Sequence, residues 1–161
     1  MATISRSWVS WLGAVAGCEF VGILGSIFTA KEIPTWYASL AKPWFQPPNW
    51  LFGPVWTVLY ALMGTAVWLA YRRATNASSR RQILTVFFMQ LILNGIWTPI
   101  FFGLHMLGVA LVVIVTLIIA ILATMMAFAR SSKWAAALLA PYLAWVVFAT
   151  VLNASLWRLN G

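Results

Sequence analysis

Long apolar segments alternate with short charged clusters along the whole chain. Five of these segments reach the length of about 20 residues that an α-helix needs to cross the hydrocarbon core of a bilayer. Because lipid offers the backbone no hydrogen-bond partners, such segments satisfy their own backbone groups as helices. The pattern predicts an all-α membrane protein, a five transmembrane helix bundle. It forms a single domain over residues 1–161, with spans at about 8–29, 47–71, 83–104, 106–129 and 134–157.

The connections between these spans differ in length. Three of them are tight, which makes sequential helices antiparallel neighbours in a compact bundle. The first connection, residues 30–46, is longer and rich in aromatic residues, and it includes Trp36 and Trp44. Since amphipathic rings suit a membrane interface, we expect this segment to form a lid-like loop over one mouth of the bundle. Pro47 and Pro48 then start the second helix, where proline is tolerated.

The charged residues mainly predict the orientation of the chain in the membrane. Only 7% of the residues are charged and 63% are hydrophobic, so the net charge of +8 indicates membrane orientation and no nucleic acid partner. By the positive-inside rule the protein is a multi-pass integral membrane protein with a cytoplasmic amino terminus, and its basic, compact chain favours a bacterial source. Seven basic residues fall on one side (Arg6, Arg72, Arg73, Arg80, Arg81, Arg130 and Lys133) and three on the other (Lys31, Lys42 and Arg158).

The chain has few residues for acid–base or metal chemistry. With no Asp, two Glu, one His and one Cys, it can assemble neither a conventional triad nor a metal site. Glu19 lies inside the first span, where an ionisable group costs about 2.5–3.5 kcal/mol and is a functional candidate. It either has a proton role or is a protonated or hydrogen-bonded residue facing the bundle interior, with Gln90, Asn94 and Asn153 as the polar residues available. His105, in a tight turn, is interpreted as structural.

Tryptophan and glycine supply two further hypotheses. Trp56, Trp97 and Trp145 each lie inside a span beside a proline, and their rings either pack the core or line a pocket for a planar hydrophobic ligand. Gly13 and Gly17 form a small-xxx-small pair that allows close backbone approach, within the chain or between two copies.

Three long blocks of the sequence, residues 36–64, 90–103 and 141–153, together resemble the TspO/translocator protein family, formerly the peripheral-type benzodiazepine receptors. The resemblance covers nearly the whole chain in the same order. It implies a five-helix bundle, often dimeric, that binds porphyrins, haem-related tetrapyrroles and sterols beneath the first long loop.

The resemblance also assigns the residues of a ligand pocket. Trp56 and Trp145 match the pocket tryptophans of the family. The other implied ligand-binding positions are Gly22 on the first helix, Trp36 and Trp44 on the loop, Trp50, Phe52, Gly53 and Val55 on the second helix, Asn94 and Trp97 on the third, and Ala149 and Leu152 on the fifth.

Four positions depart from the animal members of the family. Gln46 replaces a pocket histidine, Val109 a tryptophan, Val113 an aspartate and Ala154 the tyrosine of the sterol motif. These departures disfavour high-affinity cholesterol binding and animal-type drug binding more than they disfavour tetrapyrrole binding.

Three functional hypotheses follow. The first is a membrane binding or transport protein of the tryptophan-rich sensory protein type, for porphyrins and other hydrophobic ligands such as sterols or benzodiazepine-type molecules. It needs no cofactor, since porphyrin or haem is its ligand, and its partners are the bilayer and a second copy in a homodimer. The second is an enzyme that degrades porphyrin with light and oxygen, with Trp56 and Trp145 as catalytic candidates. The third is a proton-coupled carrier that uses Glu19.

Overall fold

The computed structural model describes residues 2–161, with side chains from residue 7 onward, so the side chain of Arg6 lies outside the described part. Within that part the chain is helical, and five segments are long and apolar enough to span a membrane, which confirms the predicted five-helix bundle. The elements are α1 (Ala2–Glu32), α2 (Trp36–Ser39), a 3-10 turn (Asn49–Leu51), α3 (Phe52–Arg73), α4 (Ala77–Thr98), a π-helical turn (Pro99–Gly103), α5 (Leu107–Ala129), α6 (Lys133–Ala137) and α7 (Ala140–Asn160).

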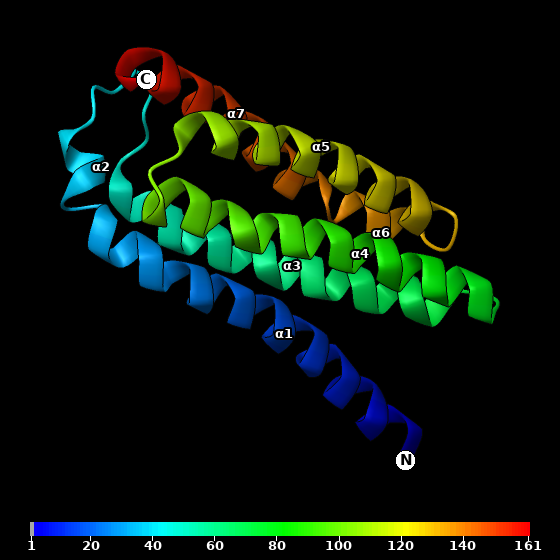
Figure 1. Ribbon diagram of the computed structural model, residues 1–161. Helices are drawn as coiled ribbons and strands as arrows, with labels where there is room; N and C mark the ends of the chain where they lie inside the picture. Colours follow the sequence, from blue (N-terminus) through cyan, green and yellow to red (C-terminus); the bar gives the residue numbers. More distant parts are fainter. Residues whose placement is uncertain (1) are drawn as a thin grey trace.

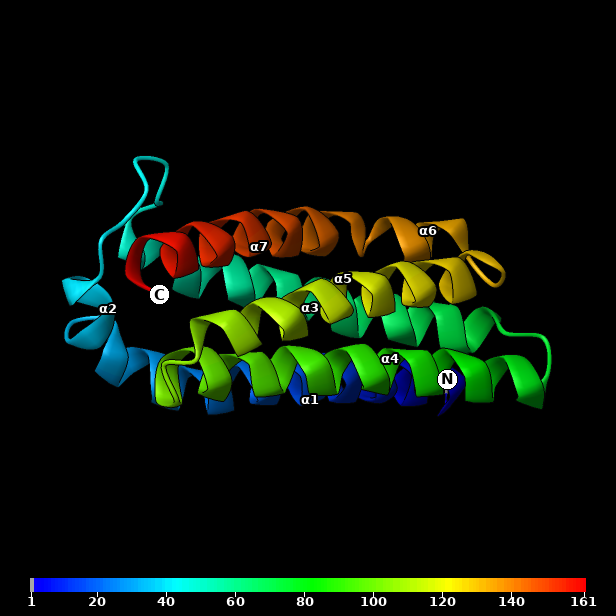
Figure 2. The same cartoon turned by 45° about the horizontal axis from the view of Figure 1, so that its top comes forward.

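The long helices run side by side in an elongated bundle (Figures 1 and 2). α4 packs mainly on α5, α5 on α7, and α1 on α3 and α4. The short helix α2 and the carboxyl terminus lie at one end, and the connection between α3 and α4 lies at the other (Figure 1). In the most apolar stretch of α1 only 6% of the residues are buried, against 28–33% in the other four spans, so α1 is the outermost helix.

Proline sets two of the helix boundaries. The second span begins at Asn49 and not at Pro47, because Pro48 is extended (ψ 139°) and a residue that precedes proline disfavours the helical region. The fifth span is divided into α6 and α7, with Pro141 in the first turn of α7. Proline has no N–H to continue the helical hydrogen bonding, so the helix restarts there.

Asn76 moves a third boundary. The side chain of Asn76 accepts a hydrogen bond from the Ser79 backbone N–H at 2.8 Å and caps α4, which therefore begins six residues before the apolar stretch that marked it in the sequence. The added turns carry Arg80 and Arg81.

Glycines define how α1 meets the bundle. A Cβ atom on Gly64 of α3 would lie 2.5 Å from Cα of Val15, so the backbones of α1 and α3 approach as closely as only glycine permits. Gly13 and Gly17 have open space around them instead. The interpretation that Gly13 and Gly17 pack against another helix of the same chain is therefore wrong, because the pair faces away from the other helices.

Candidate functional site

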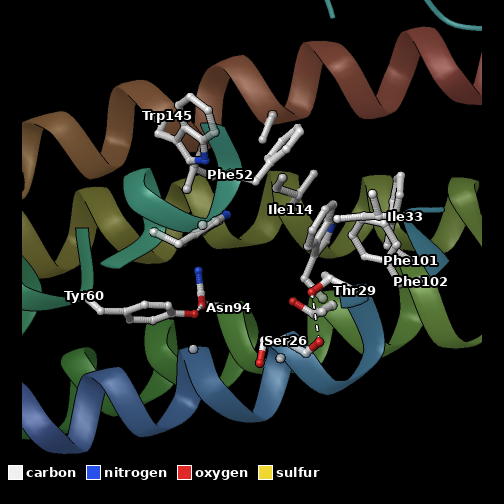
Figure 3. A pocket seen from close by; sticks show the side chains of 18 of the residues that line it. Ser26, Thr29, Ile33, Phe52, Tyr60, Asn94, Phe101, Phe102, Ile114 and Trp145 are labelled. Atoms are coloured by element: carbon white, nitrogen blue, oxygen red, sulfur yellow. Dashed lines mark hydrogen bonds between the residues drawn. The ribbon is translucent and has the colours of Figure 1, made fainter. Parts of the chain in front are cut away.

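A cavity of about 360 Å³ lies among α1, α3, α4, α5 and α7 at the loop end of the bundle (Figure 3). Its size falls within the range of small-molecule sites, and its lining is mainly apolar with a few polar groups, as such sites require. The aromatic part of the lining comes from Tyr37, Phe52, Trp56, Tyr60, Trp97, Phe101, Phe102 and Trp145.

The aromatic rings form two groups. On the α3–α7 side, the rings of Phe52 and Trp145 meet edge to face with centroids 6.0 Å apart. On the α4 side, Trp97 stacks on Phe101 at 4.8 Å. No hydrogen bond joins the indole N–H of Trp56 or Trp145 to another described residue, whereas that of Trp97 donates to Asn153 Oδ1 at 3.3 Å. Two N–H donors beside the cavity are thus free for a ligand.

A chain of hydrogen bonds closes the inner end of the cavity. Tyr60 Oη donates to Asn94 Oδ1 at 2.6 Å, Asn94 Nδ2 donates to Tyr142 Oη at 3.1 Å, and Tyr142 Oη donates to Gln90 Oε1 at 2.9 Å. Figure 3 shows Tyr60 and Asn94 across the cavity from Trp145. Because these bonds link α3, α4 and α7 within the apolar core, they fix the relative rotation of the three helices.

Gly22 on α1 gives the ring of Tyr60 its space. A Cβ at Gly22 would come within 2.5 Å of Tyr60 Cε2, so any larger residue displaces the ring. The orientation of the Tyr60 hydroxyl toward Asn94 therefore depends on a glycine from another helix.

Glu19 lines the cavity from α1 and is half-buried. None of the described residues hydrogen-bonds or ion-pairs with its carboxyl group. None of the residues suggested as its partners bonds to it. Gln90 Oε1 and Asn94 Nδ2 bond to Tyr142, and Asn153 bonds to Trp97 and to the Leu107 carbonyl oxygen, to which it donates at 2.9 Å. The interpretation of Glu19 as hydrogen-bonded to these residues is therefore wrong, because their bonds go to tyrosine hydroxyls, to the Trp97 indole and to a backbone carbonyl group.

The loop covers the outer end of the cavity and is fastened at two places. The side chain of Asn160, at the end of α7, accepts from the Ala41 N–H at 2.8 Å and donates to the Ala41 carbonyl oxygen at 3.0 Å. Glu32 Oε2 lies 3.1 Å from His105 Nε2, and the imidazole stacks on Trp36 with centroids 4.0 Å apart. These contacts join the loop to the α4–α5 turn and to the carboxyl end of α7.

Tyr37 is the loop residue buried most deeply against the cavity. It is 3% exposed, and its hydroxyl has no hydrogen-bond partner among the described residues. Burial raises the pKa of Tyr37 to about 12, so the phenol stays protonated at neutral pH. Lys42 Nζ lies 5.4 Å from the centre of the same ring and adds positive charge at this end.

The structure gathers most of the site residues suggested by the sequence around one cavity: Glu19, Gly22, Phe52, Gly53, Trp56, Asn94, Trp97, Trp145, Ala149 and Leu152. Four others lie outside the lining. Trp36 stacks on His105, Trp44 and Trp50 are 96% and 72% exposed, and Val55 packs against the core.

Sequence reasoning missed several lining residues on α1 and α3. Ser26 and Thr29 follow Gly22 at intervals of four and three residues, and Tyr60 follows Trp56 by four. Helical spacing from the positions already suspected places each on the same face, so this signal was available in the sequence.

Comparison with known proteins agrees with this architecture. Residues 14–158 match the model of the TspO/MBR family. The chain is 45% identical over 141 residues to the tryptophan-rich protein TspO of Archaeoglobus fulgidus, covering 88% of this chain and 90% of that protein. It is 37% identical over 157 residues to the tryptophan-rich sensory protein of Cereibacter sphaeroides (98% and 95% covered) and 40% identical over 154 residues to the human translocator protein (95% and 91% covered). The chain is an integral membrane protein that belongs to the TspO/MBR family.

Proposed function

We propose that the cavity binds a planar hydrophobic ligand, with porphyrins and related tetrapyrroles as the ligand class, and that the protein binds or transports such molecules in the membrane. The observation that carries the proposal is the pairing of two aromatic groups with free indole N–H donors in one cavity beneath a fastened loop. Aromatic faces stack on a macrocycle, and N–H groups bond to its polar substituents.

The charge on the loop side suits an acidic ligand. Lys42 lies over Tyr37 at the outer end of the cavity, Lys31 lies in the last turn of α1, and Arg158 lies in the last turn of α7. Two propionate groups on a porphyrin are attracted by this basic rim, while the apolar macrocycle enters the cavity.

A titration with protoporphyrin IX tests the proposal. Detergent-purified wild type, Trp145→Phe and Trp134→Phe are titrated in the dark, and the porphyrin absorbance is followed together with tryptophan quenching. Loss of the Trp145 N–H and of part of the stacking area should weaken binding about fivefold to 30-fold, since each such contact contributes about 1 kcal/mol. Trp134, which is 73% exposed and outside the cavity lining, is the matched control. The proposal is contradicted if porphyrin binding does not saturate and is the same in wild type and Trp145→Phe.

Light-dependent porphyrin degradation is a second candidate function, favoured by the surroundings of Trp56. Its ring centroid lies 5.4 Å from Tyr60 and 6.3 Å from Tyr142, so an oxidisable indole contacts two phenols. Wild type and the variant Trp56→Phe, each loaded with protoporphyrin IX and kept under light and oxygen, decide this point. A new absorbance product that forms only with intact Trp56 supports an enzyme, and its absence leaves binding alone.

Proton-coupled transport is the third candidate, favoured by the position of Glu19 on the cavity wall without a partner in the described chain. Glu19→Gln should abolish ligand flux into liposomes and leave porphyrin affinity unchanged. Unchanged flux rejects a carrier of this kind.

A homodimer is proposed for the outward face of α1. Gly13 and Gly17 lie there with open space around them, which allows a second helix to approach closely. Gly17→Leu should then shift the protein toward monomer in light-scattering measurements, and an unchanged mass contradicts the proposal.

A further inference from the structure

An open groove of about 470 Å³ lies where α3 ends and α4 begins. The connection between these helices is at the end of the bundle away from the loop (Figure 1). Tyr71 forms its α3 side. The α4 side consists of Ala77, Arg80, Arg81, Leu84, Thr85 and Phe88. Steps of three and one residues alternate along this set, so its members form one continuous stripe on the face of the helix.

The stripe changes character along α4. Arg80 and Arg81 lie near the start of the helix, and Leu84 and Phe88 follow one and two turns further into the membrane-spanning part. At 1.5 Å per residue, Phe88 lies about 10 Å from the level of Arg81. Phe88 is 53% exposed, so it presents its ring to the lipid. A charged head followed by an apolar surface has the polarity of a phospholipid.

The positive charge of this groove is not balanced within the described chain. The sequence contains two acidic residues, Glu19 and Glu32. Glu19 lies on the cavity wall, and Glu32 pairs with His105 at the loop end. A counter-anion for the groove must therefore come from outside the protein.

Two of the four arginines in this region already have polar contacts, since Arg72 bonds to Ser7 and Arg73 Nη1 donates to Ser132 Oγ at 3.2 Å. The guanidinium of Arg80 lies over the ring of Tyr71, 5.4 Å from its centre. Neither Arg80 nor Arg81 makes a side-chain hydrogen bond to another described residue, so their donors remain free.

Helix α4 itself adds positive charge to the groove. The amino end of α4 carries partial positive charge from its aligned peptide dipoles, and its first turn contains no acidic residue. Two arginines near that end are electrostatically unfavourable unless an anion lies beside them. A phosphate group satisfies both the guanidinium donors and the helix end.

We propose that this groove binds an anionic phospholipid, with its phosphate against Arg80 and Arg81 and an acyl chain along Leu84 and Phe88. Basic pockets at the membrane interface bind anionic headgroups in this way. A free phosphate uses only the charged part of the stripe and leaves the apolar part uncovered. A second copy of the chain brings an equally basic end, so like charges oppose it at this position.

Native mass spectrometry of the detergent-purified full chain tests the proposal. Wild type is titrated with phosphatidylglycerol and with phosphatidylcholine of the same acyl chains. The variant Arg80→Gln/Arg81→Gln removes the two groove charges. The matched control, Arg130→Gln/Lys133→Gln, removes two exposed charges from the same end of the bundle, outside the groove.

Wild type should prefer phosphatidylglycerol, and the groove variant should lose about 10- to 30-fold in affinity for it, since each arginine near an anionic headgroup contributes about fivefold. The control should change by less than about twofold, and affinity for phosphatidylcholine should stay the same in all three proteins. Phe88→Ala, at an exposed position, should weaken both lipids because it removes part of the acyl-chain contact.

Three results overturn the inference. Equal losses in the groove variant and the control indicate diffuse attraction without a site. Displacement of the lipid by inorganic phosphate or by glycerophosphoglycerol at equal concentration indicates an anion site to which the acyl chains of the lipid contribute no affinity. An unchanged lipid preference in the groove variant, with thermal unfolding like that of wild type, places the lipid elsewhere.

Discussion

Replacing Tyr142 with Phe removes one oxygen atom and two hydrogen bonds from the centre of the bundle. The side chain is completely buried, and its hydroxyl accepts from Asn94 Nδ2 and donates to Gln90 Oε1. Gln90 Nε2 already lacks a partner among the described residues, so the substitution leaves the whole Gln90 amide unpaired. The ring stays in place, and packing changes little.

The magnitude follows from the two lost bonds. Hydrogen bonds between helices in a membrane contribute about 0.6 kcal/mol each on average, and a buried polar group left without a partner costs about 1–3 kcal/mol. We therefore expect Tyr142→Phe to lower the free energy of unfolding by about 1–3 kcal/mol. Porphyrin affinity should fall as well, because Asn94 loses the bond that holds its amide toward Tyr60.

Equilibrium unfolding in mixed detergent micelles, followed by circular dichroism, measures this loss. Tyr71→Phe is the control, because the Tyr71 side chain is 39% exposed and makes no hydrogen bond to another described residue. Its effect should stay within about 0.5 kcal/mol. If both variants unfold alike, the chain of hydrogen bonds does not stabilise the bundle, and the reasoning fails.

Three smaller predictions concern Gly64, Ser132 and Asn160, and the first two are measured by the same unfolding experiment. Gly64→Ala should destabilise the fold by about 1–3 kcal/mol because the new methyl group meets the α1 backbone, whereas Gly13→Ala has open space and should be neutral or stabilising; equal effects would refute the close approach. Ser132→Ala should cost about 1 kcal/mol, since the hydroxyl caps α6 at 3.3 Å, and no loss would mean that the cap is dispensable. Asn160→Ala should speed proteolysis of the loop, since the bonds to Ala41 are lost, and an unchanged cleavage rate would show that other contacts hold the loop.

The helices themselves could be predicted from the sequence because a membrane span is a local property. Twenty apolar residues in a row predict a helix whatever the rest of the chain does. The helix ends depend on single contacts: Pro48 delays α3, Asn76 advances α4, and Pro141 interrupts the last span. Hydropathy does not report these local effects, so the expected and observed boundaries differ by several residues.

The site could be predicted only in part. Trp56, Trp97 and Trp145 stand out because large aromatic rings beside prolines inside spans are unusual, and all three line the cavity. The resemblance to the family also suggested Trp44 and Trp50, which are exposed, because residue type alone does not say which way a loop turns its side chains. Tertiary structure was needed to separate the two groups.

The hydrogen-bond chain from Tyr60 to Gln90 was beyond prediction for a different reason. Each member is an ordinary residue on its own helix, and the chain exists only when α3, α4 and α7 have particular rotations about their axes. Asn94 could be suspected as a partner for Glu19, since both are polar groups in apolar spans, but its amide oxygen accepts from Tyr60 and its amide nitrogen donates to Tyr142. The polar residues of different spans can pair in many ways, and the sequence does not rank them.

The helices differ in how much of their surface is buried, and therefore in how they contribute to stability and to the cavity. α3, α4, α5 and α7 contribute most of the buried core, and the hydrogen-bond chain links α3, α4 and α7, so these four helices form the body of the bundle. α1 adds a wall to the cavity but is little buried, and it is held by the close approach at Gly64 and by bonds such as Trp11 Nε1 to Thr65 Oγ1 at 3.1 Å. Segments with little buried surface open at the lowest free energy. We therefore expect α1 to be the wall of the cavity that separates first from the other helices. Substitutions in the four-helix body should therefore change stability and binding together. Substitutions on the cavity face of α1, except at Gly22 beside Tyr60, should change binding with little loss of stability.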